Sequence, residues 1–182
     1  MRAYAEIETE RLLLREPQPD DAERLLELVG DGEAMRPIGS EPGGIEVAVE
    51  HLERWLRRWE LNGMGPFLVQ VRGRPGVIGR IGPLVWNART WETSTLADAD
   101  DDAVVELGWM IASAYWGNGY APEAARAVRQ WVYDTRGVER LISLIDPANT
   151  NSVRVAEKVG AEPTETVQIL GDFPATIWVH PR

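Results

Sequence analysis

The stretch from residue 104 to residue 136 constrains the fold of this chain more than any other part of the sequence. It opens with the alternation of a strand, Gly117 and Gly119 follow in a short turn, and Pro122 suits the first turn of a helix, where its missing N–H needs no partner. Glycines beside Asn118 allow left-handed geometry, so successive N–H groups can point inward near the positive end of the helix dipole. The stretch therefore predicts a cradle for an anion, most usefully a phosphate.

The glycine turn has a second interpretation, because a Gly-x-Gly segment often makes only a tight connection. For the turn alone we weigh the two interpretations equally. The Walker phosphate loop is excluded, since Tyr120 and Ala121 follow Gly119 where a Lys-Ser/Thr pair is needed. A dinucleotide fingerprint is also excluded, because it needs a third glycine where the chain has Pro122. A phosphate site here must belong to another class.

Length and composition predict one globular domain over residues 1–182. The chain is 44% hydrophobic, and no apolar run is long enough to cross a bilayer. Charges stand where a signal peptide has its apolar core, which predicts a cytoplasmic protein with no membrane partner. The absence of cysteine excludes disulfides, thiolate metal sites and a cysteine acyl-enzyme, and we expect no metal.

The charge balance bears on the partner. The formal net charge is −10, from 29 acidic and 19 basic residues. Binding nucleic acid needs clustered Lys and Arg, so the balance argues against that partner and favours a cationic one, although acidity for solubility alone is more common. An acidic cluster, Asp98 with Asp100 to Asp102, leads into the strand at residue 104. Such a cluster is usually a solvated loop, and as a functional feature it would attract a cation.

The remaining periodicities predict an α/β chain. Asp20 and Glu23 form a predicted capping box, residues 30–44 are interpreted as a loop, and the strand–helix–strand order after residue 104 predicts a parallel pair with a right-handed crossover. The other expected elements are strands over residues 6–15, 65–71, 77–85, 140–145, 165–170 and 175–180, and helices over residues 20–30, 45–60 and 149–159.

Glu106 is the unusual residue of the strand that begins at residue 104. The period of two places it on one face with Val104 and Gly108, and a carboxylate among apolar residues costs stability unless it is paired. It is salt-bridged, at an exposed edge, or kept for proton transfer, and the residues alone leave all three open. We expect His51 to be a packed or solvated side chain and His180 to be only terminal.

Several different short motifs are distributed along nearly the whole chain: Thr9-Glu10-Arg11-Leu12 with Leu14-Arg15, Glu106-Leu107-Gly108-Trp109, Trp116-Gly117-Asn118-Gly119-Tyr120-Ala121 with Glu123-Ala124, and Asn149 to Gly160. Together they resemble the GNAT superfamily of N-acyltransferases, in particular the branch of ribosomal-protein alanine and serine N-acetyltransferases. The coenzyme A loop of the superfamily, Gln/Arg-x-x-Gly-x-Gly/Ala, falls on Trp116 to Ala121. A tryptophan takes the Gln/Arg place, which leaves the backbone cradle intact.

The resemblance implies a single α/β domain with a mixed, mostly antiparallel sheet of about seven strands and about four helices. It also implies a parallel strand pair that splays apart beyond the loop, with the pantetheine arm of acetyl-CoA entering the gap. The implied activity is N-acetyl transfer from acetyl-CoA, the co-substrate, to a primary amine by direct attack in a ternary complex.

The same resemblance implies the site residues. N–H groups from the loop would hold the pyrophosphate, and one near Trp109 to Ile111 would polarise the thioester carbonyl. The implied cofactor-binding set is Trp109, Met110, Ile111, Trp116, Gly117, Asn118, Gly119, Tyr120, Ala121, Asn149 and Ser152.

The implied acid and base come from two motifs. Glu106 matches the proposed base, which must take a proton because an ammonium has no lone pair. Ala156 stands where many superfamily members carry a thiol-protonating tyrosine, so Ser152 or water would protonate the thiolate. Asn149 and Ser152 are also good helix N-caps, which is their simplest structural explanation.

The acceptor is not determined by the sequence. A protein N-terminus, a polyamine, an aminoglycoside, an amino acid or a small amine would all fit, and a homodimer stays open. Two rival functions are also kept: a CoA-responsive binding protein of the same fold without turnover, and a structural or interaction domain that binds no phosphate ligand.

Overall fold

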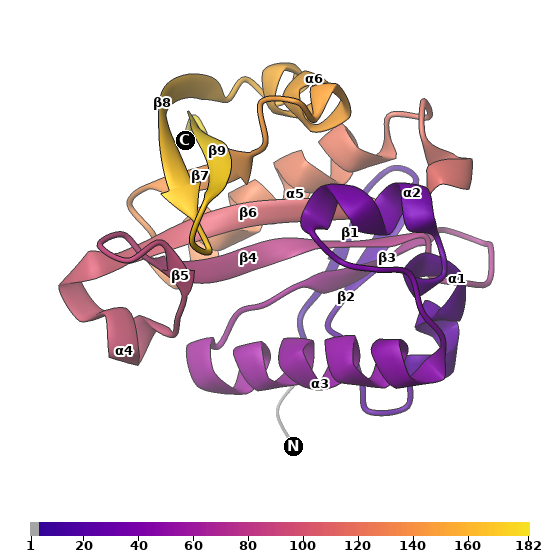
Figure 1. The fold of residues 1–182 in the computed structure, drawn as a ribbon. Helices are drawn as coiled ribbons and strands as arrows, with labels where there is room; N and C mark the ends of the chain where they lie inside the picture. Colours follow the sequence, from indigo (N-terminus) through magenta and orange to yellow (C-terminus); the bar gives the residue numbers. More distant parts are fainter. Residues whose placement is uncertain (1–3) are drawn as a thin grey trace.

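The computed structural model describes residues 4–182, and nine strands of this part of the chain form one sheet (Figure 1). The strand order is β1-β2-β3-β4-β6-β7-β9-β8, and the short β5 pairs with β4. Every neighbouring pair is antiparallel except β6 with β7. The strands are β1 Glu6–Glu8, β2 Leu12–Arg15, β3 Phe67–Val71, β4 Gly79–Asn87, β5 Glu92–Thr93, β6 Ala103–Ile111, β7 Leu141–Ile145, β8 Glu162–Ile169 and β9 Phe173–Val179.

The described residues also form α-helices and short 3₁₀ turns. None of these helices is long and apolar enough to span a bilayer. The 3₁₀ turns are Ala22–Leu25, Arg36–Ile38, Asp100–Asp102 and Ser113–Tyr115. The α-helices are α1 Leu26–Val29, α2 Gly32–Met35, α3 Ile45–Asn62, α4 Leu96–Ala99, α5 Tyr120–Arg136 and α6 Thr150–Lys158.

Helices cover both faces of the sheet, with α3 and α5 on opposite sides of β4 and β6 (Figure 1). Val128 and Val132 of α5 are fully buried in one apolar core. Leu52 and Trp55 of α3 pack with α1 and α2 in the other core. The two long helices are amphipathic because their apolar residues recur at helical spacing, and burying that stripe is what attaches each helix to the sheet.

The sheet opens between β6 and β7. Their parallel ladder contains only the pairs Val105 with Leu141 and Glu106 with Ile142, although β6 continues to Ile111. The expected α/β fold with a mixed, mostly antiparallel sheet and a splayed parallel pair is therefore confirmed. Backbone groups of β6 beyond Glu106 face a gap where a ladder partner would otherwise be.

The sheet has nine strands, and the expectation of about seven was wrong. Residues 6–15 form two strands rather than one, because the chain turns between them: the Thr9 N–H donates to the Leu12 carbonyl at 2.9 Å, and the Leu12 N–H donates to the Thr9 hydroxyl at 2.9 Å. The other unpredicted strand is β5, in a segment without clear periodicity. The described helices also exceed the expected four, because α1, α2 and α4 are single turns.

The predicted capping box at Asp20 is not formed. The first 3₁₀ turn begins at Ala22 with Asp21 before it, and no side-chain cap is made. Instead the Asp21 carboxylate accepts two hydrogen bonds from Arg15, at 2.6 and 2.7 Å, and is almost fully buried. The predicted loop over residues 30–44 also contains α2, which is capped by Asp31.

Candidate active site

The glycine turn between β6 and α5 has the predicted backbone geometry. Gly117 and Gly119 have φ angles of 79° and 78°, a region that side chains disfavour. Within the described residues, no backbone hydrogen bond outside the helix uses the N–H groups of residues 117–121. These donors lie at the start of a 17-residue helix, so the turn is built to receive an anion.

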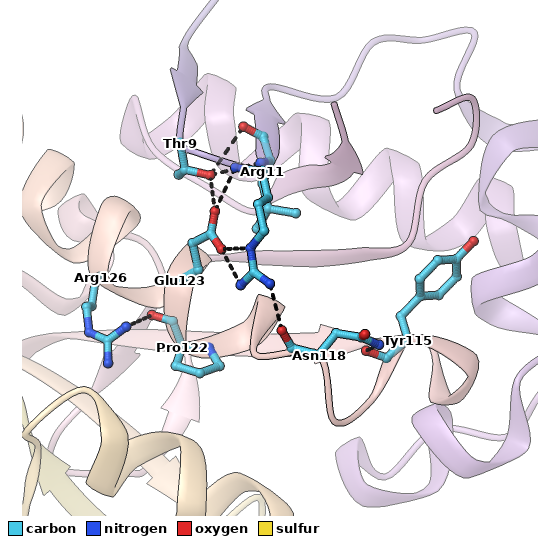
Figure 2. A network of polar contacts seen from close by, with 8 residues as sticks. Thr9, Arg11, Tyr115, Asn118, Pro122, Glu123 and Arg126 are labelled. Atoms are coloured by element: carbon cyan, nitrogen blue, oxygen red, sulfur yellow. Dashed lines mark hydrogen bonds and ion pairs between the residues drawn. The ribbon is translucent and has the colours of Figure 1, made fainter. Parts of the chain in front are cut away.

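A network from the N-terminal hairpin holds this turn in place (Figure 2). Glu123 in the first turn of α5 accepts hydrogen bonds from the Thr9 hydroxyl at 2.6 Å and from the backbone N–H of Arg11 at 3.0 Å. The Arg11 guanidinium binds Glu123 at 2.6 Å, donates to the Asn118 carbonyl at 2.9 Å, and covers the Tyr120 ring. Although partial burial opposes it, these bonds lower the pKa of Glu123, so the network is fully formed at neutral pH.

A second contact fixes the other end of the turn. Asp31 caps α2 through the N–H groups of Glu33 and Ala34, and its second oxygen accepts from the Ser113 N–H at 2.6 Å. Desolvation opposes ionisation, but these hydrogen bonds lower the pKa of Asp31. The turn is thus held from the β1–β2 connection at one end and from α2 at the other.

The turn forms one wall of a cavity of about 350 Å³, which we call the loop cavity. The end of β6 forms its floor, and α6 forms the facing wall. Every residue of the predicted cofactor-binding set lines it except Asn118. The Asn118 side chain instead donates to the Tyr115 and Trp116 carbonyls at 3.0 and 3.2 Å, so it rigidifies the turn from within.

Several residues of the loop cavity were not predicted. Tyr115 follows β6, and Arg154 and Lys158 lie one turn apart on α6 and line the cavity opposite the glycines. The i, i+4 spacing of these two cations was a signal available in the sequence. What it did not show is which face of α6 meets the cavity.

A second cavity of about 380 Å³, the sheet cavity, lies over β4, β6 and β7 and is bordered by the β8–β9 hairpin. Glu106, one of the two predicted catalytic residues, lines it. Ser152, the other, lines both cavities, as do Pro37, Trp109 and Asn149. The two cavities therefore meet at the place where β6 and β7 separate.

Glu106 is buried in the sheet cavity, with 7% of its surface exposed. Glu106 lies on a central strand, so it is not at an exposed edge of the sheet. It is also not salt-bridged, because the ion pairs among the described residues do not include it. One oxygen accepts a hydrogen bond from Trp86 Nε1 at 2.6 Å. Burial raises the pKa of the Glu106 carboxyl, opposed by the Trp86 bond and by the charge of Arg80. A carboxyl of raised pKa is closer to the ideal for a base near neutral pH.

Alternation along β6 shows which backbone donors face the gap. The Ala112 N–H binds the Ile78 carbonyl at 2.8 Å, so even-numbered residues of this end of β6 bond to β4 and odd-numbered ones face the other way. The Ile111 carbonyl accordingly accepts from Trp116 Nε1 at 2.6 Å. The N–H of Trp109 thus points toward the gap, whereas that of Met110 is directed to β4.

The Asn-x-x-Ser segment forms the start of α6. The Asn149 side chain caps the helix by accepting from the Ser152 N–H at 3.1 Å, so its simple structural explanation holds. The Ser152 side chain remains at the junction of the two cavities. Ala156 is fully buried in the core.

His180 is not merely terminal, which corrects the prediction. Its Nε2 lies 2.8 Å from the Ser143 hydroxyl, which itself donates to the Leu107 carbonyl at 2.6 Å. The ring also meets Trp109 edge to face. Burial lowers the pKa of His180 to about 4, so the ring is neutral at physiological pH. Through Ser143 and Trp109 it connects β7 with β6 beside the gap. His51 is packed against Trp55, as expected, and burial lowers its pKa to about 4 as well.

A sheet that opens beside a glycine turn, with two cavities meeting in the gap, is the architecture of an acyl-CoA-dependent transferase. Residues 11–162 match the acetyltransferase (GNAT) domain. Because this match spans most of the sequence, the chain belongs to the GNAT acetyltransferase family, and it is an acetyl-CoA-dependent acetyltransferase.

Individual relatives agree with this membership. The chain is 27% identical over 154 residues to the uncharacterized N-acetyltransferase YnaD of Bacillus subtilis, covering 85% of this chain and 81% of that protein. It is 44% identical over 69 residues to the uncharacterized protein YkkB of the same species, but that match spans only 38% of this chain and 40% of YkkB.

A solved structure shares the fold at low sequence identity. The structure of RimL, described as a ribosomal L7/L12 alpha-N-protein acetyltransferase, superposes with a TM-score of 0.76 at 13% identity, covering 100% of this chain and 96% of that one. This likeness shows the fold alone.

Proposed function

We propose that the protein is an N-acetyltransferase that moves the acetyl group of acetyl-CoA to a primary amine by direct attack in a ternary complex. One observation carries the proposal. The loop cavity, with its free N–H groups, and the sheet cavity, with the buried base candidate Glu106, meet at Trp109, Asn149 and Ser152. Two substrates bound in these cavities would have their reacting ends together at that junction.

The loop cavity suits the diphosphate and pantetheine of acetyl-CoA. N–H groups of residues 117–121 would hold the diphosphate, where a side chain in place of Gly117 or Gly119 would intrude. Arg154 and Lys158 on the facing wall add positive charge for the phosphates. The pantetheine arm would follow the open edge of β6 toward the junction.

Starting from the ammonium form, the nitrogen loses two protons, one before attack to free its lone pair and one after the bond to carbon has formed; the thiolate gains one proton and the other leaves to solvent. The amine nitrogen forms a bond to the thioester carbon, while the Trp109 N–H stabilises the negative charge that develops on the carbonyl oxygen. Glu106, directly or through water, takes a proton from the amine. The carbon–sulfur bond then breaks, and Ser152 or water protonates the thiolate. No covalent enzyme intermediate is needed, in keeping with the absence of cysteine.

The proposed acceptor is cationic at its reacting end, because a primary amine is mostly protonated in neutral water. Capture by the acidic cluster stays a prediction. Asp102 is paired with Arg89 at 2.7 Å, and Asp98 is bonded to Thr95, which caps α4. No member of the cluster lines either cavity, so its effect would act at a distance.

A panel of amines tests this function. Peptides with free N-termini, polyamines, aminoglycosides, amino acids and simple amines would be incubated with acetyl-CoA, with release of the CoA thiol and product mass as readouts. We expect thiol release that depends on one class of amine. Calorimetric binding of acetyl-CoA without thiol release for any amine would favour the CoA-responsive binding protein instead. Failure to bind acetyl-CoA would contradict both.

A further inference from the structure

The sheet cavity contains a guanidinium group without a partner. Arg80, on β4, lines the cavity, and its Nε and Nη1 atoms are inaccessible to solvent and bond to no other described residue. Burial lowers the pKa of Arg80 to about 10, opposed by the charge of Glu106, so the group is still a cation at neutral pH. A buried cation with free donors destabilises the protein unless a ligand binds it.

Glu106 does not serve as that partner. One of its oxygens accepts from Trp86, and no ion pair links it to Arg80 in the described chain. Both groups instead border the space above Gly108. A Cβ built on this glycine would lie 3.2 Å from Arg80 Nη1 and 3.6 Å from Glu106 Oε1. A guanidinium and a carboxyl group thus face the same opening.

Two sides of the sheet cavity are apolar, while Asp146 and the start of α6 border the rest. Leu84 and Trp86 of β4 form one side, and Ile169, Leu170 and Phe173 of the β8–β9 hairpin form the other. Leu170 is 62% exposed and Phe173 is 40% exposed, so both side chains leave apolar surface beside the cavity. An apolar group of a ligand would cover them.

We propose that the acceptor is a free amino acid with an apolar side chain, whose carboxylate binds Arg80 while its amine faces Glu106. The inference rests on the proposed N-acetyl transfer and narrows its substrate class. A carboxylate can accept two parallel hydrogen bonds from a guanidinium and neutralise its charge. A polyamine would bring a second cation against Arg80, and a peptide N-terminus would offer a carbonyl oxygen without the charge.

Three matched amines test the proposal: leucine, leucinamide and 3-methylbutylamine, which share one apolar skeleton and differ only at the carboxylate. We expect kcat/KM for leucine to exceed that of the other two by about tenfold or more, the value of one charge-assisted pair. Equal rates for the three, or a preference for leucinamide or a leucyl peptide, would overturn the proposal and point to a chain terminus.

Two variants locate the effect. Arg80→Leu should remove the preference for leucine over 3-methylbutylamine, and Arg80→Lys, which keeps the charge but not the fork of donors, should retain part of it. Acetyl-CoA affinity, which should not change, reports whether each variant is folded. If folded Arg80→Leu keeps the preference for leucine, or if Arg80→Lys keeps all of it, another residue must recognise the carboxylate.

A binding measurement separates this inference from the proposed function. Calorimetry on the CoA-bound protein should detect leucine more strongly than 3-methylbutylamine, whether or not turnover occurs. If leucine binds in this way but no thiol is released, the transferase proposal fails and the Arg80 site stands. If thiol is released with amines that lack a carboxylate and leucine does not bind, the Arg80 site fails and the transferase stands.

Discussion

The loop cavity and the sheet cavity are built in different ways. The glycine turn of the loop cavity is held by Arg11, Glu123 and Asp31, whose polar groups are paired within the protein. The sheet cavity instead holds a buried guanidinium, that of Arg80, whose Nε and Nη1 have no partner among the described residues. A site for acetyl-CoA can present backbone donors that paired side chains hold in place, whereas a site that selects its acceptor presents side chains that only the ligand completes.

This contrast has a consequence for mutations. Backbone N–H groups carry the proposed binding in the loop cavity, so substitutions there should act through geometry and through cofactor affinity. Side chains carry the proposed chemistry in the sheet cavity, so substitutions there should act on turnover and on the choice of acceptor. The following predictions separate the two regions, from the largest expected effect to the smallest.

Glu106→Gln should lower kcat by roughly two to four orders of magnitude with little change in acetyl-CoA affinity, because the amide keeps the shape but cannot accept a proton. Burial raises the pKa of Glu106, so the acidic limb of the wild-type pH–rate profile should lie at a higher pH than the ordinary glutamate pKa, which is near 4.3 in model peptides at about 25 °C. The variant should lose that limb. Near-normal turnover with the limb intact would make Glu106 structural.

Gly119→Asp should weaken acetyl-CoA binding by at least about a hundredfold, because it places a side chain at a φ of 78° and an anion in the proposed anion site. Calorimetry is the measurement. Gly73→Asp is the matched control, since Gly73 has a φ of 74° in a turn away from both cavities. Unchanged affinity in folded Gly119→Asp would place the cofactor elsewhere.

Acid should destabilise the fold through the buried histidines. The ring of His180 is neutral in the folded protein down to pH of about 4, but in the unfolded chain it protonates near 6.5. The neutral ring therefore makes its full contribution to the free energy of unfolding above pH 6.5. That contribution falls as the pH drops from 6.5 toward 4, and the loss is about 2 kcal/mol at pH 5.

Urea unfolding at pH 7.5 and pH 5 measures this contribution. His180→Gln, which keeps a donor for Ser143, should show a pH dependence smaller by that amount. Glu106 acts in the opposite sense because its pKa is raised, and His51 acts in the same sense, so the difference between wild type and variant is the decisive quantity. Identical pH dependence in the two proteins would contradict the buried neutral ring.

Arg11→Met should weaken acetyl-CoA binding by on the order of tenfold and leave kcat at saturation unchanged, because it releases Glu123 and the Asn118 carbonyl while keeping the donors of the turn. The control is Arg54→Met, which removes another half-exposed ion pair, on α3. If kcat falls as much as the affinity for acetyl-CoA, then the loop cavity affects turnover as well as cofactor binding, and the proposed division of roles between the two cavities is wrong.

The acidic cluster should have the smallest effect. Replacing Asp100 and Asp101 with asparagine should raise the acceptor KM by less than about twofold at low salt, because exposed charges act only over about 8 to 10 Å at ordinary ionic strength. Acetyl-CoA affinity should stay the same. An unchanged KM at every sodium chloride concentration would show that the cluster plays no part in acceptor capture.

Local patterns in the sequence determined the loop cavity. The turn from Gly117 to Pro122, the strand before it and the helix after it are contiguous, so periodicity and glycine geometry were enough to predict them. The cap at Asn149 was readable for the same reason. Resemblance to the GNAT family added the splayed strands and the role expected of Glu106, which lie beyond what local pattern can show.

Only the tertiary structure decided the sheet cavity. Arg80 and Glu106 border the same space over Gly108 because β4 pairs with β6 in a particular register. Ser143 contacts His180 because β9 lies beside β7. These residues are separated by dozens of positions, and strand order is set by the burial of whole sheet faces rather than by any short motif. The local sequence therefore predicted the turn that we propose for acetyl-CoA, while the proposed choice of acceptor depends on side chains that only the assembled sheet brings together.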